Sequence, residues 1–187
     1  MKRILFVLIA VLSLPISIYS QNLSAYGVSL GEYQYKVENI LENKGKSIKY
    51  DTNKNGETLL EVSSPTIGGV NFDYGTFVFN KEGKLRAMTF QSYDPPGTGD
   101  PGTQWETRFR SKANKCKNSF LTMVQNLPLK YGAPSIYTDT SATWQLGNQS
   151  ISLKYEYKYE YNSYGWVDSF VSVSLTYKLI NPSDVDY

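Results

Sequence analysis

The sequence contains no histidine, and this absence removes several classes of catalytic and metal site. Ser-His and Cys-His nucleophiles, imidazole acid-base chemistry and histidine-containing zinc sites all need the missing side chain. The chain also lacks the G-x-S-x-G, S-x-x-K, P-loop and G-x-G-x-x-G patterns of common hydrolases and nucleotide-binding proteins. The sequence therefore predicts a protein that is not an enzyme and has no catalytic residue, cofactor or metal to assign.

Cysteine is almost absent, because Cys116 is the single one and cannot form an internal disulfide. Lys112, Lys115 and Lys117 lie close to it in the sequence, and nearby cations favour a reactive thiolate. Cys116 also falls on the apolar stripe of an expected helix, and the chain has no histidine to act as its base. We therefore expect Cys116 to be buried and inert.

A long apolar run occurs at the start of the chain. Lys2 and Arg3 precede an uncharged stretch at residues 4–18, and the small Ser20 follows it. The run is shorter than the span of about 20 residues that a transmembrane helix needs, and its flanks are typical of a secretory signal peptide. We expect a signal peptide at residues 1–20 that is cleaved near Ser20, and a periplasmic or secreted mature protein without a membrane span.

Neither sign of charge dominates the mature chain. Loss of Lys2 and Arg3 with the signal peptide changes 19 basic and 17 acidic residues to 17 of each. Nucleic acids and anionic membranes are bound mainly through clustered Lys and Arg. The sequence therefore predicts no nucleic-acid partner, and it favours an envelope or extracellular protein, or alternatively a glycan.

Two stretches of the chain follow one plan, in which a helix is followed by antiparallel strands. Residues 21–93 contain the capping-box pattern Ser29–Glu32, and residues 103–187 begin with the same pattern at Thr103–Glu106. Repetition of one supersecondary unit indicates that the copies share a continuous core. We therefore predict an α+β fold of two tandem repeats, each with one helix followed by antiparallel strands, and both helices packed on one face of the sheet.

Apolar residues recur at helical spacing in both stretches. The two stripes are Tyr33, Val37, Ile40 and Leu41, and Phe109, Ala113, Cys116, Phe120, Val124 and Leu127. Lys44 and Gly45 are expected to end the first helix, and Pro128 to stop or kink the second. Trp105 and Trp144 are expected in the core.

The segment at residues 94–102 separates the two stretches. Its density of proline and glycine predicts a linker, since these residues interrupt helices and strand ladders. Asp94 and Asp100 offer two carboxylates, whereas Ca²⁺ takes six or more oxygen ligands. We interpret them as turn formers.

Alternating segments between the turns predict antiparallel strands. Their ranges are 46–51, 57–63, 69–80, 84–93, 135–139, 142–147, 149–160 and 166–179. For the last two strands, pairing of Tyr155 with Val171 aligns the apolar faces, leaves residues 161–165 as the loop, and sets Lys158 opposite Asp168.

Aromatic residues gather in this last hairpin. Tyr155 and Tyr157 continue the apolar face of the strand and are expected under a helix. The residues nearer the tip, beyond the reach of a short helix, are the candidate contact surface: Tyr159, Tyr161, Tyr164 and Trp166. Phe170, expected opposite Glu156 on the charged face, is either an exposed aromatic anchor or the sign of a β-bulge.

These features predict an exported, non-enzymatic binding module that recognises another protein through a sheet face and an aromatic hairpin tip. The alternative is a glycan-binding protein that uses the same aromatic residues. A carboxylate-dependent hydrolase is the third hypothesis, because two Asp or Glu residues suffice for glycoside hydrolysis. The spacing of the acidic residues selects no such pair.

The segments Ser29-Leu30-Gly31 with Val37 and Leu41, and Lys130-Tyr131-Gly132-Ala133-Pro134, carry a resemblance to known exported domains. They resemble the β-lactamase inhibitor protein-like group and the outer-membrane assembly lipoproteins of the SmpA/OmlA type. The resemblance implies a helical layer on an antiparallel sheet, duplicated in tandem and used to grip another protein. The chain lacks the disulfide cysteines of the first group and the anchoring cysteine of the second, and no contact residue can be carried over from either.

Overall fold

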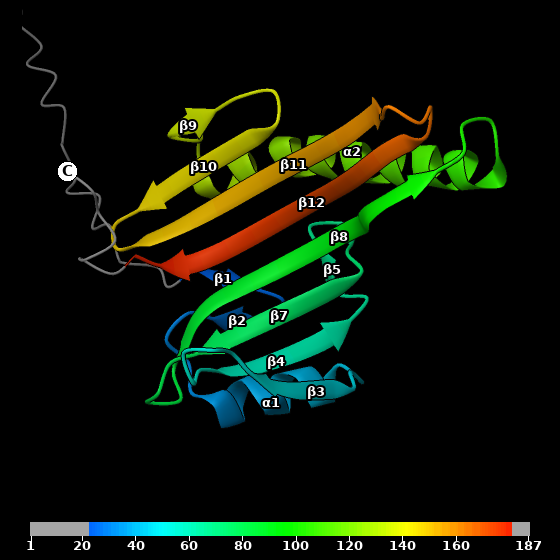
Figure 1. Ribbon diagram of the computed structural model, residues 1–187. Coiled ribbons are helices and arrows are strands. Elements are labelled where there is room, and N and C mark those ends of the chain that lie inside the picture. Colours follow the sequence, from blue (N-terminus) through cyan, green and yellow to red (C-terminus); the bar gives the residue numbers. More distant parts are fainter. Residues whose placement is uncertain (1–22, 181–187) are drawn as a thin grey trace, which may run out of the picture.

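The computed structural model describes residues 23–180, which form two helices and twelve strands. Eight of these strands make one antiparallel sheet, which forms the body of the molecule (Figure 1). From one edge to the other, its strands are β3 (Ile48–Thr52), β4 (Thr58–Ser63), β7 (Tyr74–Phe79), β8 (Leu85–Gly99), β12 (Val167–Leu179), β11 (Gln149–Tyr161), β10 (Ser141–Leu146) and β9 (Ile136–Tyr137). The expected signal peptide lies outside the described residues.

The helices are α1 (Gln34–Asn43) and α2 (Gln104–Tyr131). Two short hairpins accompany them, β1 (Ser24–Ala25) with β2 (Val28–Ser29), and β5 (Thr66–Ile67) with β6 (Val70–Asn71). Neither helix in residues 23–180 is long and apolar enough to cross a membrane.

One hydrophobic core lies between the helices and a single face of the sheet. Val37 and Leu41 of α1 belong to the same buried cluster as Phe109 and Phe120 of α2. The sheet contributes large residues from neighbouring strands, and Phe90 on β8 makes edge-on ring contacts with Phe77 on β7 and Tyr177 on β12. Alternation along each strand directs the remaining side chains to the opposite face.

The predicted division into two helix-plus-strands repeats is wrong. The last strand of the first stretch, β8, pairs directly with the last strand of the chain, β12, so one mostly β structure with a single large sheet contains both halves. The helices have 10 and 28 residues, and α2 packs on β8 as well as on β11 and β12. In the described part of the chain, the hairpins β1–β2 and β5–β6 occur in the first stretch alone. The apolar faces of β8 and β12 cover a common core. The two halves of the chain therefore share one core and do not have a separate core each.

The capping boxes also differ from expectation. Ser29 belongs to β2, and α1 begins at Gln34 after Tyr33, without a side-chain cap. Helix α2 does begin after Thr103, and Glu106 accepts a hydrogen bond from the backbone N–H of Gly102 rather than of Thr103. The negative charge of Glu106 in the first turn still stabilises the start of α2, because it interacts favourably with the positive end of the helix dipole.

The structure places both groups of prolines inside regular elements. Pro128 does not stop α2, which continues to Tyr131 and has Gly132 as its C-cap. Pro95 and Pro96 lie inside β8 instead of beginning a linker. At this point β8 has no neighbour on the β7 side within the described chain, because β7 begins only at Tyr74, which stands opposite Gln91. A missing N–H is tolerated at such a free edge and at the irregularity in the β8–β12 ladder that lies here.

Candidate functional site

The β11–β12 hairpin projects beyond most of the sheet and carries the predicted contact residues at its tip (Figure 1). Strand β11 ends at Tyr161, opposite Val167. In the turn, the N–H of Asn162 donates to the Trp166 carbonyl at 2.8 Å, and Asn162 Oδ1 accepts from the N–H groups of Tyr164 and Trp166 at 3.0 and 3.2 Å. Gly165 adopts a positive φ of 79° that suits glycine. The tip is therefore a hydrogen-bonded turn of defined shape.

Three of the five predicted contact residues expose their rings at this tip. The exposed fractions are 64% for Tyr161, 84% for Tyr164 and 46% for Trp166. Large aromatic residues at this exposure leave apolar area in water, which is the usual composition of a contact surface. The tip therefore carries three large, exposed rings within residues 161–166.

Tyr159 is not exposed at the tip as predicted, because α2 is long enough to extend over the hairpin and contact it. Its hydroxyl donates to Glu106 Oε1 at 2.6 Å, and its ring stacks on Phe109 with centroids 5.9 Å apart. The Arg110 guanidinium lies 4.8 Å from the centre of the Tyr159 ring and also donates a hydrogen bond to Glu106. Tyr159 is therefore part of the junction between α2 and the hairpin, and it supports the exposed rings.

Electrostatics at this junction favour an ionised Glu106. Hydrogen bonds from Tyr159, from the Gly102 N–H and from Arg110 lower the pKa of Glu106 to about 2. The same Glu106 contact raises the pKa of Tyr159 to about 12. Lys154 lowers the pKa of Glu156 as well. A glycosidase general acid needs a raised pKa, so neither carboxyl group suits that part of the hydrolase hypothesis.

The junction includes a close contact that the sequence did not predict. The indole of Trp105 lies against Gly99 at the end of β8, and a Cβ on Gly99 would stand 2.2 Å from the ring. Trp105 also stacks on Phe109, with 5.9 Å between centroids and 9° between planes. The sequence did contain a signal for this contact: a glycine at the end of a strand lies close in sequence to a tryptophan at the start of a helix.

Phe170 lies on the sheet face opposite α2, as expected, but the register of the hairpin differs by two residues. Tyr155 pairs with Val173, Phe170 stands opposite Lys158, and the loop covers residues 162–166. The shift keeps the predicted faces, because it is an even number of residues. The bulge that was one of the two alternatives for Phe170 lies on the other side of the strand, where the β12–β8 register shifts between Ser169 and Val171.

A shallow groove of about 500 Å³ adjoins Phe170. Its lining comes from β8, β11 and β12 and includes Thr98, Lys158, Asp168 and Phe170. Asp168 Oδ1 accepts hydrogen bonds from Thr98 Oγ1 at 2.9 Å and from Asn162 Nδ2 at 3.3 Å. The groove thus combines one aromatic side chain with an amine, a carboxylate and a hydroxyl next to the exposed tip.

The sheet face around this groove is polar and carries neither of the two helices of residues 23–180. Hydroxyl residues line up directly across five adjacent strands, in the order Thr143, Ser152, Thr176, Thr89 and Thr76. The Oγ1 atoms of Thr89 and Thr176 are 3.2 Å apart. This open face offers many hydrogen-bonding groups to a partner.

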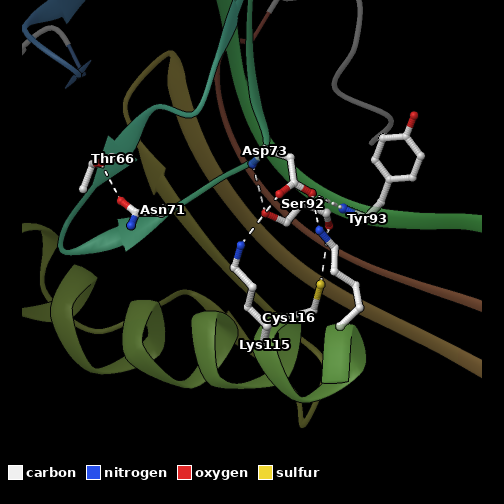
Figure 2. Close-up of polar contacts among 8 residues, drawn as sticks. Thr66, Asn71, Asp73, Ser92, Tyr93, Lys115 and Cys116 are labelled. Atoms are coloured by element: carbon white, nitrogen blue, oxygen red, sulfur yellow. Dashed lines mark hydrogen bonds and ion pairs between the residues drawn. The ribbon is translucent and has the colours of Figure 1, made fainter. Parts of the chain in front are cut away.

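A second polar cluster ties α2 to the sheet (Figure 2). Asp73 accepts hydrogen bonds from Lys112 Nζ and from the Tyr93 N–H, and its own N–H donates to Ser92 Oγ at 3.1 Å. The Cys116 thiol lies 3.7 Å from the Ser92 carbonyl oxygen. Burial raises the pKa of Cys116 to about 11, which fits the predicted inert thiol. The cluster is a structural anchor between α2, β8 and the turn before β7.

A groove of about 810 Å³ runs along the exposed side of α2 and includes Trp105, Arg108, Lys112 and Lys115 in its lining. Asp73 neutralises part of this charge through ion pairs with Lys112 and Lys115. Within residues 23–180, no group of three or more His, Cys, Asp or Glu side chains is placed to hold a metal ion.

Comparison of the chain with known protein families, with curated proteins and with solved structures found no match. The arrangement of residues at the hairpin tip, the adjoining groove and the open sheet face therefore carries the functional argument.

Proposed function

We propose that the protein is an exported, non-enzymatic binding module that recognises another protein of the cell envelope or the extracellular space. The tip residues Tyr161, Tyr164 and Trp166 form the main contact, and the open sheet face beside Phe170 adds polar contacts. The observation that carries this proposal is the exposure of three large rings on a turn that Asn162 holds in shape.

Binding through these rings is favourable because they offer a large contact area and lose little conformational entropy on binding. Tyr and Trp supply large contact areas with few rotatable bonds, and they dominate the binding energy of many interfaces. A turn that is already ordered loses little conformational freedom on binding. Truncation of a ring at the centre of such a contact costs about 2 kcal/mol or more, which corresponds to about thirtyfold in affinity.

The test compares the tip with a matched exposed tyrosine elsewhere. A photo-crosslinking residue is placed at Tyr164 or, as the control, at Tyr35, which is 58% exposed on α1. We expect a distinct protein adduct in the native cells from position 164, and loss of that adduct when Trp166→Ala is added. Thermal unfolding of Trp166→Ala should match that of Tyr35→Ala, because both side chains are largely exposed. Equal adducts from both positions, or an adduct that survives Trp166→Ala, would contradict the proposal.

Glycan binding is the second candidate, and the groove beside Phe170 supports it. Exposed aromatic faces suit sugar rings, and Lys158, Asp168 and Thr98 offer hydrogen-bonding groups at the same place. Titration with polysaccharides distinguishes the two candidates: a shift of Trp166 fluorescence that Phe170→Ala abolishes would favour the glycan, whereas a protein adduct without such a shift favours the first proposal.

A further inference from the structure

Strand β11 has a free edge along its outer half. Strand β10 pairs with β11 only as far as Lys154, which stands opposite Ser141, and the Tyr155 N–H donates to the Thr140 carbonyl at 2.8 Å. Residues 156–161 continue in the sheet and pair with β12 alone, and no other strand of residues 23–180 lies beside them. Figure 1 shows β11 extending past β10 toward the hairpin tip.

The direction of the backbone groups on this edge follows from the last bonded residue. Tyr155 directs its N–H toward β10, so alternation directs the N–H and C=O groups of Tyr157, Tyr159 and Tyr161 to the same, unpaired side. The segment contains neither proline nor glycine. The edge therefore presents three consecutive donor and acceptor pairs to an incoming strand.

Edges of this kind are usually protected by charge, and Glu156, Lys158 and Glu160 alternate in sign here. Their charges are exposed: Lys158 and Glu160 side chains are 49% and 71% accessible and lie 3.4 Å apart at Nζ and Oε2. An incoming strand with an arbitrary order of charges would place like charges opposite these residues or leave them without an opposite charge. The alternating charges of β11 therefore favour a partner strand with the complementary order of charges.

That partner is the segment itself in the opposite direction. With a two-fold axis at Tyr159, Tyr159 faces Tyr159, Tyr157 faces Tyr161, and Lys158 faces Glu160 on both sides of the axis. All three tyrosine pairs then bring outward-directed backbone groups together, which gives about six hydrogen bonds. Opposite charges stand directly across from each other in both remaining positions.

The neighbouring symmetric registers fail. An axis at Lys158 places Lys158 against itself, Glu156 against Glu160, and Tyr161 against Tyr155, whose N–H is already bonded to Thr140. An axis at Glu160 places that carboxylate against itself. Odd shifts would match outward-directed with inward-directed backbone groups. One register therefore satisfies the charges, the backbone and the length of the free edge together.

We propose that a second copy of this chain pairs along the β11 edge, with its two-fold axis at Tyr159, and so forms an isologous dimer with a continuous sheet. The tyrosine row that α2 supports then extends across both copies on one face. The Lys158–Glu160 pairs lie on the other face. Tyr164 and Trp166 lie beyond the paired segment, whereas Tyr161 belongs to it. The pairing is argued from the free edge and the charges of β11, so it does not depend on the proposed function.

Charge exchange tests the register. In a dimer of Lys158→Glu, two carboxylates face each other on both sides of the axis, and in a dimer of Glu160→Lys, two ammonium groups do. The double variant Lys158→Glu/Glu160→Lys restores opposite charges, and an equimolar mixture of the two single variants restores them in a heterodimer. Lys154→Glu is the matched control, because Lys154 lies on the same face where β10 covers the edge.

Sedimentation equilibrium of the mature chain and its variants gives the readout. We expect a dimer for the unaltered chain and for Lys154→Glu, and a dissociation constant raised about tenfold or more for each single variant. The double variant and the mixture should regain dimerisation. A monomeric unaltered chain at millimolar concentration would overturn the proposal, and so would single variants that dimerise as well as the unaltered chain, or a mixture that stays monomeric.

Discussion

The contact between Gly99 and Trp105 permits a prediction that tests the junction of α2 with the projecting strands. In Gly99→Ala, the new Cβ would lie 2.2, 2.5 and 2.6 Å from three atoms of the Trp105 ring. Ordinary carbon contacts begin near about 3.5 Å, so the ring or the strand must move by about 1.3 Å. Gly99 is not in the left-handed region, and the clash is therefore the main effect of the substitution.

The expected loss of stability follows from the cost of overpacking. Inserting a methyl group into a packed site typically costs about 1–3 kcal/mol. For a chain of this size, each kcal/mol lowers Tm by about 2–4 °C, so we expect a decrease of about 2–12 °C. Displacement of Trp105 would also disturb its stacking on Phe109, which is buried in the core.

Gly97→Ala is the matched control, because the nearest atom to its added Cβ is the Pro95 carbonyl oxygen at 3.8 Å. It should be neutral or slightly stabilising, since alanine reduces the freedom of the unfolded chain. Adding Trp105→Ala to Gly99→Ala should recover much of the loss, with a coupling of about 1–3 kcal/mol in the double-mutant cycle by urea unfolding. Equal unfolding midpoints for Gly99→Ala and Gly97→Ala would refute the reasoning.

Two further predictions concern ionisable groups. The pKa of Glu106 is lowered to about 2 in the folded chain, from about 4.3 when unfolded, so its stabilising contribution is complete above the unfolded pKa and is lost as the pH falls to about 2. The free energy of unfolding in urea should therefore depend less on pH in Glu106→Gln than in the unaltered chain across this range. An equal pH dependence in the two proteins would contradict the lowered pKa of Glu106. Burial raises the pKa of Cys116 to about 11, so alkylation of the native protein at a pH of about 8 should be at least about a hundredfold slower than in denaturant; rapid labelling of the native chain would show that the thiol is accessible.

The local parts of the fold were predictable from the sequence. The stripe Phe109, Cys116, Phe120 and Leu127 is buried on α2, as its spacing predicted. Helix α1 ends at Asn43, just before the expected Lys44 and Gly45. These features depend on residues within a few positions of one another, where periodicity and helix-end preferences act directly.

The parts that failed depend on contacts between distant segments. The capping-box pattern at Ser29–Glu32 fits more than one local structure, and pairing of β2 with β1 decided against a helix start. The pairing of β8 with β12 decided against two repeats, and the free edge of β8 together with the irregularity in the β8–β12 ladder makes Pro95 acceptable inside the strand. Such pairings between distant strands are hard to predict from a single sequence, because the apolar face of each strand could pair with several other strands.

For the candidate site, the hairpin and its exposed rings were predictable, and the role of Tyr159 was not. The exposure expected of Tyr159 rested on a short helix. The first turns of α2 extend to the hairpin instead, where Glu106 and Arg110 contact Tyr159. The i,i+4 spacing of Glu106 and Arg110 was visible in the sequence, but the position of that pair over the hairpin follows from the fold alone.

The projecting part of the sheet explains how exposed aromatic residues can be kept in order. Beyond β7 and β10, the sheet narrows to the outer parts of β8, β12 and β11. Three strands with few neighbours would be mobile by themselves, but Trp105 on Gly99 and Glu106 on Tyr159 fix both outer strands to the start of α2. The rings at the tip and the free edge of β11 are thus held in place by the same junction, so a partner at either surface meets an ordered structure and loses less entropy on binding.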